Sequence, residues 1–147
     1  MFYKNHSPFC IFFNLFIFIY IRSDSVHLSD QENHEVFGKC NNPNGHGHNY
    51  TLEVTVKGAI NSKTGMVMNV TDLKKIINDV VMDTMDHKHL DKDVPAFRDE
   101  KMVTTTENVA VVIFNGIKKC LPPKVFLYKV KLHETDKNVV VFKGEYN

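Results

Sequence analysis

One cysteine and two histidines occur within the segment GKCNNPNGHGHNY, which runs from Gly38 to Tyr50. His46 and His48 are two residues apart, so in a strand both side chains lie on the same face. Two imidazoles placed in this way can bind one metal ion, and a thiol such as Cys40 beside a cation can ionise and act as a nucleophile or base. The alternative is a polar loop whose histidines are partly buried and hydrogen-bonded to the backbone.

A carboxylate occupies an unexpected position in the alternating segment VFLYKVKLHE. One face of that segment carries Phe126, Tyr128, Val130 and Leu132. Glu134 continues this apolar face, and burying an unpaired carboxylate is costly. A ligand that presents two adjacent N–H groups would satisfy it in bidentate fashion. Water, or a lysine such as Lys129 or Lys131, is the alternative partner.

Asp86 directly precedes His87 in the segment MDHKHLDKD. An aspartate that polarises an imidazole can relay a proton near neutral pH. Neighbours in sequence do not face each other on a helix, so this pairing requires the two residues to lie at a helix end or beyond it. The alternative is a solvated pair that interacts only with the helix dipole.

The elements that must position these residues are those of one α+β domain. Alternation predicts a half-buried strand over 49–57, and extending it backwards places His46 and His48 on its buried face. Apolar residues at helical spacing predict a helix from the N-cap Asn69 to about Met85.

Two further elements complete the domain. Thr104 and Glu107 have the spacing of a capping box, so a second helix is expected from there to Pro122. Alternating residues on either side of the turn TDKN then predict a terminal hairpin. The expected order is one or two strands, two helices and a hairpin.

Composition limits the classes of partner. The chain has 147 residues, enough for one domain with a hydrophobic core. Its 18 Lys and Arg nearly balance 17 Asp and Glu, so no long-range field favours nucleic acid or an anionic membrane. Cys10, Cys40 and Cys120 form an odd set without zinc-finger spacing, which favours a reducing compartment such as the cytoplasm.

The N-terminal segment differs from the rest of the chain. FCIFFNLFIFIYI, from Phe9 to Ile21, is apolar except for Asn14 and is too short to span a bilayer as a helix. Three interpretations remain open: a buried first strand, a signal sequence or membrane anchor, and disordered or aberrant sequence. We therefore separate residues 1–26, an atypical hydrophobic segment, from a domain over 27–147.

Several motifs resemble those of the eukaryotic 6-pyruvoyl-tetrahydropterin synthases. They are FGKCNNPNGHGHNY, TGMVMN, LDKDVP, TTENVAV and YKVKLHETD, and the likeness runs from about Leu28 to Glu145. The resemblance implies the tunnelling fold, an antiparallel sheet with two helices on one face, whose subunits join their sheets into a barrel. It also implies a homohexamer, a dimer of trimers, with active sites between subunits.

The same resemblance implies a lyase that converts 7,8-dihydroneopterin triphosphate to 6-pyruvoyl-tetrahydropterin in tetrahydrobiopterin biosynthesis, with zinc (Zn2+) as cofactor. The catalytic residues that match are Cys40, the general base, with Asp86 and His87 as a proton relay. Those that match the pterin-binding segment are Thr105, Thr106, Glu107 and Glu134. Those that match zinc ligands are His46 and His48.

Two positions depart from the family pattern. His89 replaces an asparagine, and Ile21 falls where the family's first strand, of the type FSASHRL, supplies a third zinc-binding histidine. Because catalytic zinc normally has three protein ligands, we predict that this chain binds zinc weakly and has low activity. Ile21→His should raise both the zinc affinity and the activity. His27 lies six residues further on and would replace the ligand only if the strand slipped or bulged.

Three functional interpretations remain. The first is an active pterin synthase whose third ligand is supplied otherwise. The second is a non-catalytic homologue that serves as an assembly or interaction subunit. The third is a sibling enzyme of the same fold, such as a carboxy-tetrahydropterin synthase.

Overall fold

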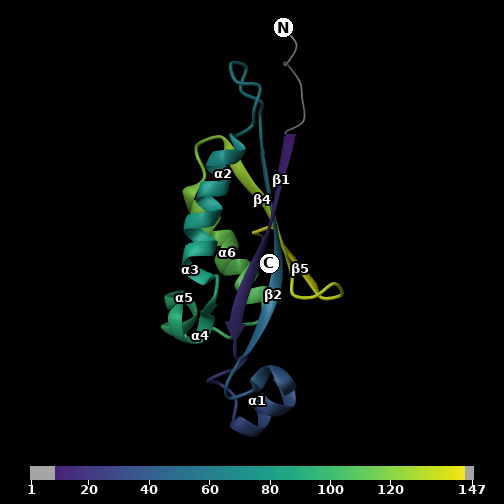
Figure 1. Ribbon diagram of the computed structural model, residues 1–147, viewed down its shortest axis with the longest axis vertical. Coiled ribbons are helices and arrows are strands. Elements are labelled where there is room, and N and C mark those ends of the chain that lie inside the picture. The colour runs from purple at the N-terminus through teal and green to yellow at the C-terminus, as the bar shows by residue number, and fades with distance from the viewer. Residues whose placement is uncertain (1–8, 145–147) are drawn as a thin grey trace.

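Five strands form one sheet in the order β3-β1-β2-β4-β5 in the computed structural model, which describes residues 9–144. The strands are β1 (Phe9–Ile21), β2 (His46–Gly58), β3 (Lys88–His89), β4 (Val125–His133) and β5 (Val139–Phe142). All pairs are antiparallel except β1 with β3, which run parallel over two residues. The long helices lie along one face of this sheet (Figure 1). The predicted fold class, a mainly antiparallel sheet with two helices on one face, is confirmed.

Residues 9–21 of the N-terminal segment form β1, so the first of the three interpretations describes this part; residues 1–8 lie outside the described residues. β1 pairs with β2 along its whole length without a register shift. Ile17, Ile19 and Ile21 face the helices and are buried, whereas Phe12 and Phe16 on the other face are 64% and 79% exposed. The alternation of isoleucine with aromatic residues suits a strand that is covered on one side only.

The first long helical segment spans residues 70–85, as predicted. It consists of α2 (Val70–Ile77), the π-helical turn η2 (Asn78–Met82) and α3 (Asp83–Met85). The side chain of Asn69 accepts a hydrogen bond from the Thr71 N–H and is the N-cap. The π turn was not predicted, because a single extra residue per turn leaves no clear trace in the apolar spacing.

The second long helix, α6 (Thr106–Cys120), begins one residue later than its predicted cap requires. Thr105, not Thr104, is the N-cap, and its side chain accepts a hydrogen bond from the Asn108 N–H. Thr104 is fully buried and donates its hydroxyl proton towards the end of β1 instead. Spacing alone does not distinguish adjacent threonines, because either can act as a cap.

The predicted apolar face of β4 is only half right. Leu132 is buried, but Phe126 is 60% exposed and Leu127 takes the inward position. A β-bulge leaves Tyr128 unpaired with β2, and one extra residue exchanges the two faces of a strand. Glu134 lies beyond the bulge and keeps the parity of Leu132, so its predicted direction is unaffected.

Short helices close the end of the sheet where β2 begins. They are α1 (Asp30–Phe37), the 3-10 turn η1 (Gly38–Asn41), α4 (Leu90–Asp93) and α5 (Pro95–Arg98). α1 was not predicted, although Ser29 and Glu32 form a complete capping box that the sequence shows. Figure 1 shows α1 beyond the lower end of the sheet. No helix within residues 9–144 is long and apolar enough to cross a membrane.

The hydrophobic core lies between the sheet and the long helices. Its fully buried members include Leu52 and Val54 of β2, Leu73 of α2, and Ile113 and Ile117 of α6. This core fixes the sheet against the helices. The sheet end near α1 is therefore a rigid frame for side chains that leave the core.

Candidate active site

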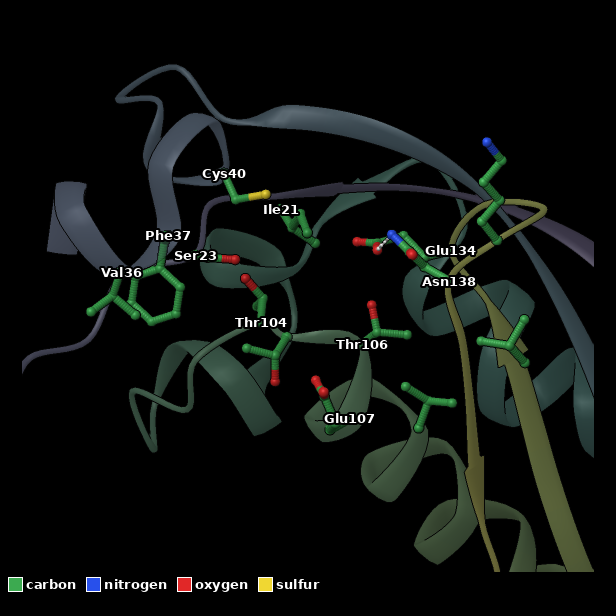
Figure 2. A pocket seen from close by; sticks show the side chains of 14 residues that line it. Ile21, Ser23, Val36, Phe37, Cys40, Thr104, Thr106, Glu107, Glu134 and Asn138 are labelled. Atoms are coloured by element: carbon green, nitrogen blue, oxygen red, sulfur yellow. Dashed lines mark hydrogen bonds between the residues drawn. The ribbon is translucent and has the colours of Figure 1, made fainter.

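Five of the predicted site residues meet around one cavity at the α1 end of the sheet. The cavity has a volume of about 550 Å³, and its predicted members are Cys40, Thr105, Thr106, Glu107 and Glu134. They come from η1, from the start of α6 and from the residue that follows β4 (Figure 2). This volume is within the range of sites for small organic ligands.

The backbone of Cys40 is tied to the chain that follows β1. Its carbonyl accepts a hydrogen bond of 2.9 Å from the Ser23 N–H. The side chain of Asn41 donates to the Ser23 carbonyl and to Asp24. Burial raises the pKa of the Cys40 thiol above its ordinary value, and the carboxylate of Glu134 raises this pKa further. The thiol is therefore in place but needs a cation or a basic partner to ionise near neutral pH.

Glu134 is held at the mouth of the terminal hairpin. Its N–H donates to the Asn138 carbonyl, and the Asn138 amide donates to its Oε2 at 3.4 Å. Figure 2 shows this pair beside Ile21 and across from Cys40. Lys131, one of the alternative partners, lies instead 3.5 Å from Glu53. The Glu134 carboxylate thus has acceptor capacity that faces the cavity.

His46 and His48 lie on the same face of β2, as the parity of the strand predicts. Their ring centroids are 4.7 Å apart, and His48 Nε2 lies 3.7 Å from Glu134 Oε1. Both ring nitrogens of His46 and Nε2 of His48 are buried, and residues 9–144 offer them no hydrogen-bond partner. Burial, reinforced by His48, lowers the pKa of His46, which favours the neutral imidazole that metals bind. The alternative of backbone-bonded rings does not describe His46.

Ile21 lies beside these histidines, where the sequence predicts that a third zinc ligand is missing. It pairs directly with His46 across β1 and β2, and its side chain is 2% exposed and lines the cavity. Within residues 9–144, no group of three His, Cys, Asp or Glu side chains is arranged to hold a metal ion. The pair of histidines fits two ligands of a cation, but the described chain does not complete a site with three protein ligands.

Gly45 lets the loop before His46 approach the end of β1. It has a φ of +71°, and a Cβ there would lie 3.0 Å from the Ile21 carbonyl oxygen and 2.9 Å from His89 Nε2. A side chain would clash with both groups and would strain the backbone. The absence of a side chain at Gly45 therefore allows the residue before His46 to lie against the Ile21 carbonyl.

Asp86 and His87 form the predicted pair, but outside this cavity. They follow α3, and Asp86 Oδ2 lies 2.8 Å from His87 Nδ1. The Phe18 N–H donates to Asp86 Oδ1, and the Phe18 carbonyl accepts from the His87 N–H. The pair borders a separate cavity of about 460 Å³ beside Phe16 and Phe18. A single chain therefore does not bring the pair to Cys40.

The electrostatics of the pair suit a proton relay. Burial acts to raise the pKa of Asp86, but hydrogen bonds from Phe18 and His87 lower it below its ordinary value. The carboxylate thus stays ionised against His87, whose side chain is 76% exposed. His87 has a φ of +57°, an uncommon conformation that two backbone hydrogen bonds to β1 and the helix end maintain.

Sequence reasoning missed three residues in or beside the site. Val36 and Phe37 of α1 line the cavity, and the capping box of α1 is the signal that could have found them. Tyr50, predicted only as an apolar strand residue, is fully buried beside His48, with 5.8 Å between the two ring centroids. Burial raises the pKa of Tyr50, so the phenol remains protonated.

The fold and the cavity are those of an α+β domain with a site for a small ligand, and known proteins specify it further. Residues 21–145 match the family of 6-pyruvoyl tetrahydropterin synthase. The 6-pyruvoyl tetrahydrobiopterin synthase of Poecilia reticulata is 60% identical over 124 residues, which cover 84% of this chain and 82% of that protein. The Homo sapiens protein of the same name is 60% identical over 121 residues, covering 82% and 81%.

A solved structure agrees with the sequence comparisons. Caenorhabditis elegans 6-pyruvoyl tetrahydropterin synthase superposes with a TM-score of 0.89 at 42% identity, covering 99% of this chain and 100% of that chain. The chain therefore belongs to the 6-pyruvoyl tetrahydropterin synthase family. It is an enzyme of tetrahydrobiopterin biosynthesis, with the tunnelling fold. The family match begins at Ile21, so most of β1 precedes it, although β1 completes the sheet.

Proposed function

We propose that this enzyme converts 7,8-dihydroneopterin triphosphate to 6-pyruvoyl-tetrahydropterin, with elimination of triphosphate. The observation that carries this proposal is the cavity in which the Cys40 thiol and the Glu134 carboxylate face a common space. An acceptor for the amino-pyrimidinone edge and a base for the carbinol side chain are the groups that the reaction needs. The net change moves hydrogens within the substrate, so no external oxidant is consumed.

Glu134 orients the pterin in this proposal. Two adjacent N–H groups of the pterin donate to the carboxylate, and Thr105, Thr106 and Glu107 frame the ring from the start of α6. This arrangement directs the three-carbon side chain towards the opposite wall. Cys40 removes a proton from that side chain there, acting as the general base.

Asp86 and His87 would come from a second copy of the chain. In one chain the pair borders a different cavity, so the site is incomplete without a neighbour. We place the site between subunits of a homohexamer, a dimer of trimers whose sheets join into a barrel. His87 would then hold or deliver the proton that Asp86 stabilises.

His46 and His48 would bind the zinc ion of this family, which acidifies carbinol hydrogens when bound. Because Ile21 supplies no donor, the residues do not make a complete three-ligand site, and we propose weak occupancy. None of these proposed steps depends on the metal.

A reducing, cytoplasmic compartment suits free Cys10, Cys40 and Cys120. The proposal involves neither nucleic acid nor membrane.

The test is incubation of the purified protein with 7,8-dihydroneopterin triphosphate, followed by chromatography of the products. 6-Pyruvoyl-tetrahydropterin and triphosphate in equal amounts support the proposal. Binding of neopterin without turnover would favour the non-catalytic interpretation, and a different pterin product the sibling enzyme.

Complementation tests the shared site. Cys40→Ala and His87→Ala chains are each expected to be nearly inactive. If neighbouring copies share the site, co-expression should restore about a quarter of the normal turnover, because random assembly leaves that fraction of sites intact. Absence of restoration in mixed oligomers would place both residues in the same chain.

A further inference from the structure

Asp91, in α4, joins two segments that build the cavity. Its Oδ2 accepts a hydrogen bond of 2.8 Å from the Arg22 N–H at the end of β1. Its two carboxylate oxygens lie 3.2 and 3.3 Å from the Thr104 hydroxyl. The same hydroxyl lies 3.2 Å from the Arg22 carbonyl. Neither segment is near Asp91 in sequence, so the carboxylate joins long-range partners.

Both segments continue into the cavity wall. Ile21 and Ser23 flank Arg22 and line the cavity, and Thr105 and Thr106 follow Thr104. The Ser23 N–H donates to the Cys40 carbonyl at 2.9 Å. A continuous set of hydrogen bonds therefore runs from the Asp91 carboxylate through residues 22 and 23 to the backbone of Cys40.

Glu134 is held independently of this set. It is fixed by the pairing of β4 with β2 and by Asn138. Displacing Asp91 should therefore move the thiol and the threonine wall but leave the pterin-reading carboxylate in place. The two halves of the cavity have separate supports.

We propose that Asp91 is a positioning residue that holds the Cys40 thiol and the Thr104–Thr106 wall in register with the bound pterin. The proposal rests on the proposed role of Cys40 as the base. Hydrogen bonds that place a reacting group act through geometry, and a displacement near 1 Å can cost about a hundredfold in rate. Asp91 itself does not line the cavity, which distinguishes it from a catalytic residue.

Asp91→Asn is the first test, because it keeps the size of the side chain but replaces one acceptor oxygen with a donor. We expect kcat to fall about 10- to 100-fold, while the dissociation constant for neopterin changes less than about threefold. The matched control is Asp93→Asn in the same helix. Asp93 is exposed and accepts only from the His89 N–H among the described contacts, so kcat should be unchanged.

Alkylation of Cys40 gives a readout that does not require turnover. Iodoacetamide labelling, resolved by peptide mass spectrometry, should be at least about threefold faster at Cys40 in Asp91→Asn, because the tether is loosened. Exposed Cys120 is the internal reference for the reagent. If the unmodified protein has no turnover, the proposed function fails, yet this measurement still decides the role of Asp91.

Thr104 provides a second pair of variants if Asp91→Asn does not fold. Thr104→Val removes the hydroxyl at nearly constant volume and should reproduce the loss of kcat and the faster labelling. Thr104→Ser keeps the hydroxyl and should restore both. Equal kcat and equal Cys40 labelling in Asp91→Asn and Asp93→Asn would overturn the proposal, as would Thr104→Val and Thr104→Ser that behave alike.

Discussion

The Cys40–Glu134 cavity and the Asp86–His87 pair are built in different ways. The cavity collects side chains from four separate parts of the chain, and the histidines beside it have buried ring nitrogens with no hydrogen-bond partner in the described part of the chain. The pair is formed by neighbours in sequence and is held by the backbone of Phe18, whose N–H donates to the Asp86 carboxylate and whose carbonyl accepts from the His87 N–H. The cavity region therefore leaves polar groups available to a partner or ligand, whereas the hydrogen bonds that hold the pair are made within the chain.

This difference explains how the two regions can work together. An exposed pair whose internal hydrogen bonds are satisfied can be presented to another molecule without rearrangement. A cavity with unsatisfied groups gains most from a partner or ligand that supplies what it lacks. Substitutions in one region at a time can separate the contributions of the two regions to turnover.

The largest effect is expected from Cys40→Ala. Removing the proposed base should lower turnover by about two to four orders of magnitude. Zinc content and thermal stability should be retained, because the thiol is only half-buried. Turnover is measured by product chromatography, and unchanged turnover would show that Cys40 is a structural thiol. The mutant leaves the Asp86–His87 pair intact, so it isolates the cavity.

Glu134→Gln should affect binding more than assembly. The substitution places an amide donor against the donors of the pterin and should cost on the order of 2 to 4 kcal/mol of affinity. Neopterin binding is measured by fluorescence titration, and oligomer size by gel filtration. Normal binding by the mutant would make the carboxylate only a residue at the strand end.

Local pattern in the sequence was enough to predict the frame of the molecule. Alternation predicted β2, and helical spacing with Asn69 predicted the segment over residues 70–85, because burial of one face imposes these periods. It also predicted the direction of Glu134. It failed where a single residue matters, at the bulge beside Tyr128 and at the choice of Thr105 over Thr104 as the cap.

Contacts between distant segments could not be predicted from local pattern. Nothing in the order of residues indicated that Asp91 would join Arg22 to Thr104, because these contacts follow from how α4 packs against β1. The position of Ile21 was different. Counting back from Cys40 predicted that Ile21 falls at the position of the family's third zinc ligand, and the structure pairs Ile21 with His46.

Ile21→His should complete the metal site and is expected to have a moderate effect. A third imidazole beside His46 and His48 should raise zinc affinity by at least about 10- to 100-fold, since disturbing even outer-shell partners costs that much. Zinc per subunit is measured by elemental analysis after dialysis against a chelator. His27→Ala is the control and should change nothing, because His27 lies in a turn beyond β1. One tightly bound zinc in the unmodified chain, lost on His27→Ala, would contradict this assignment.

The smallest effect is a pH dependence set by Cys40. Because burial and Glu134 raise the pKa of the thiol, the thiolate is the minor form near neutral pH and its fraction increases with pH. Turnover should therefore rise with pH by up to about tenfold per unit until the thiol has ionised. Asp86 has a lowered pKa and remains ionised over this range, so it should not oppose the rise. In Ile21→His loaded with zinc, the nearby cation should move the rise to lower pH, whereas His87→Ala should lower turnover without moving it. A rate that falls between pH 7 and 9 would exclude a thiolate base and would make His87 the candidate base.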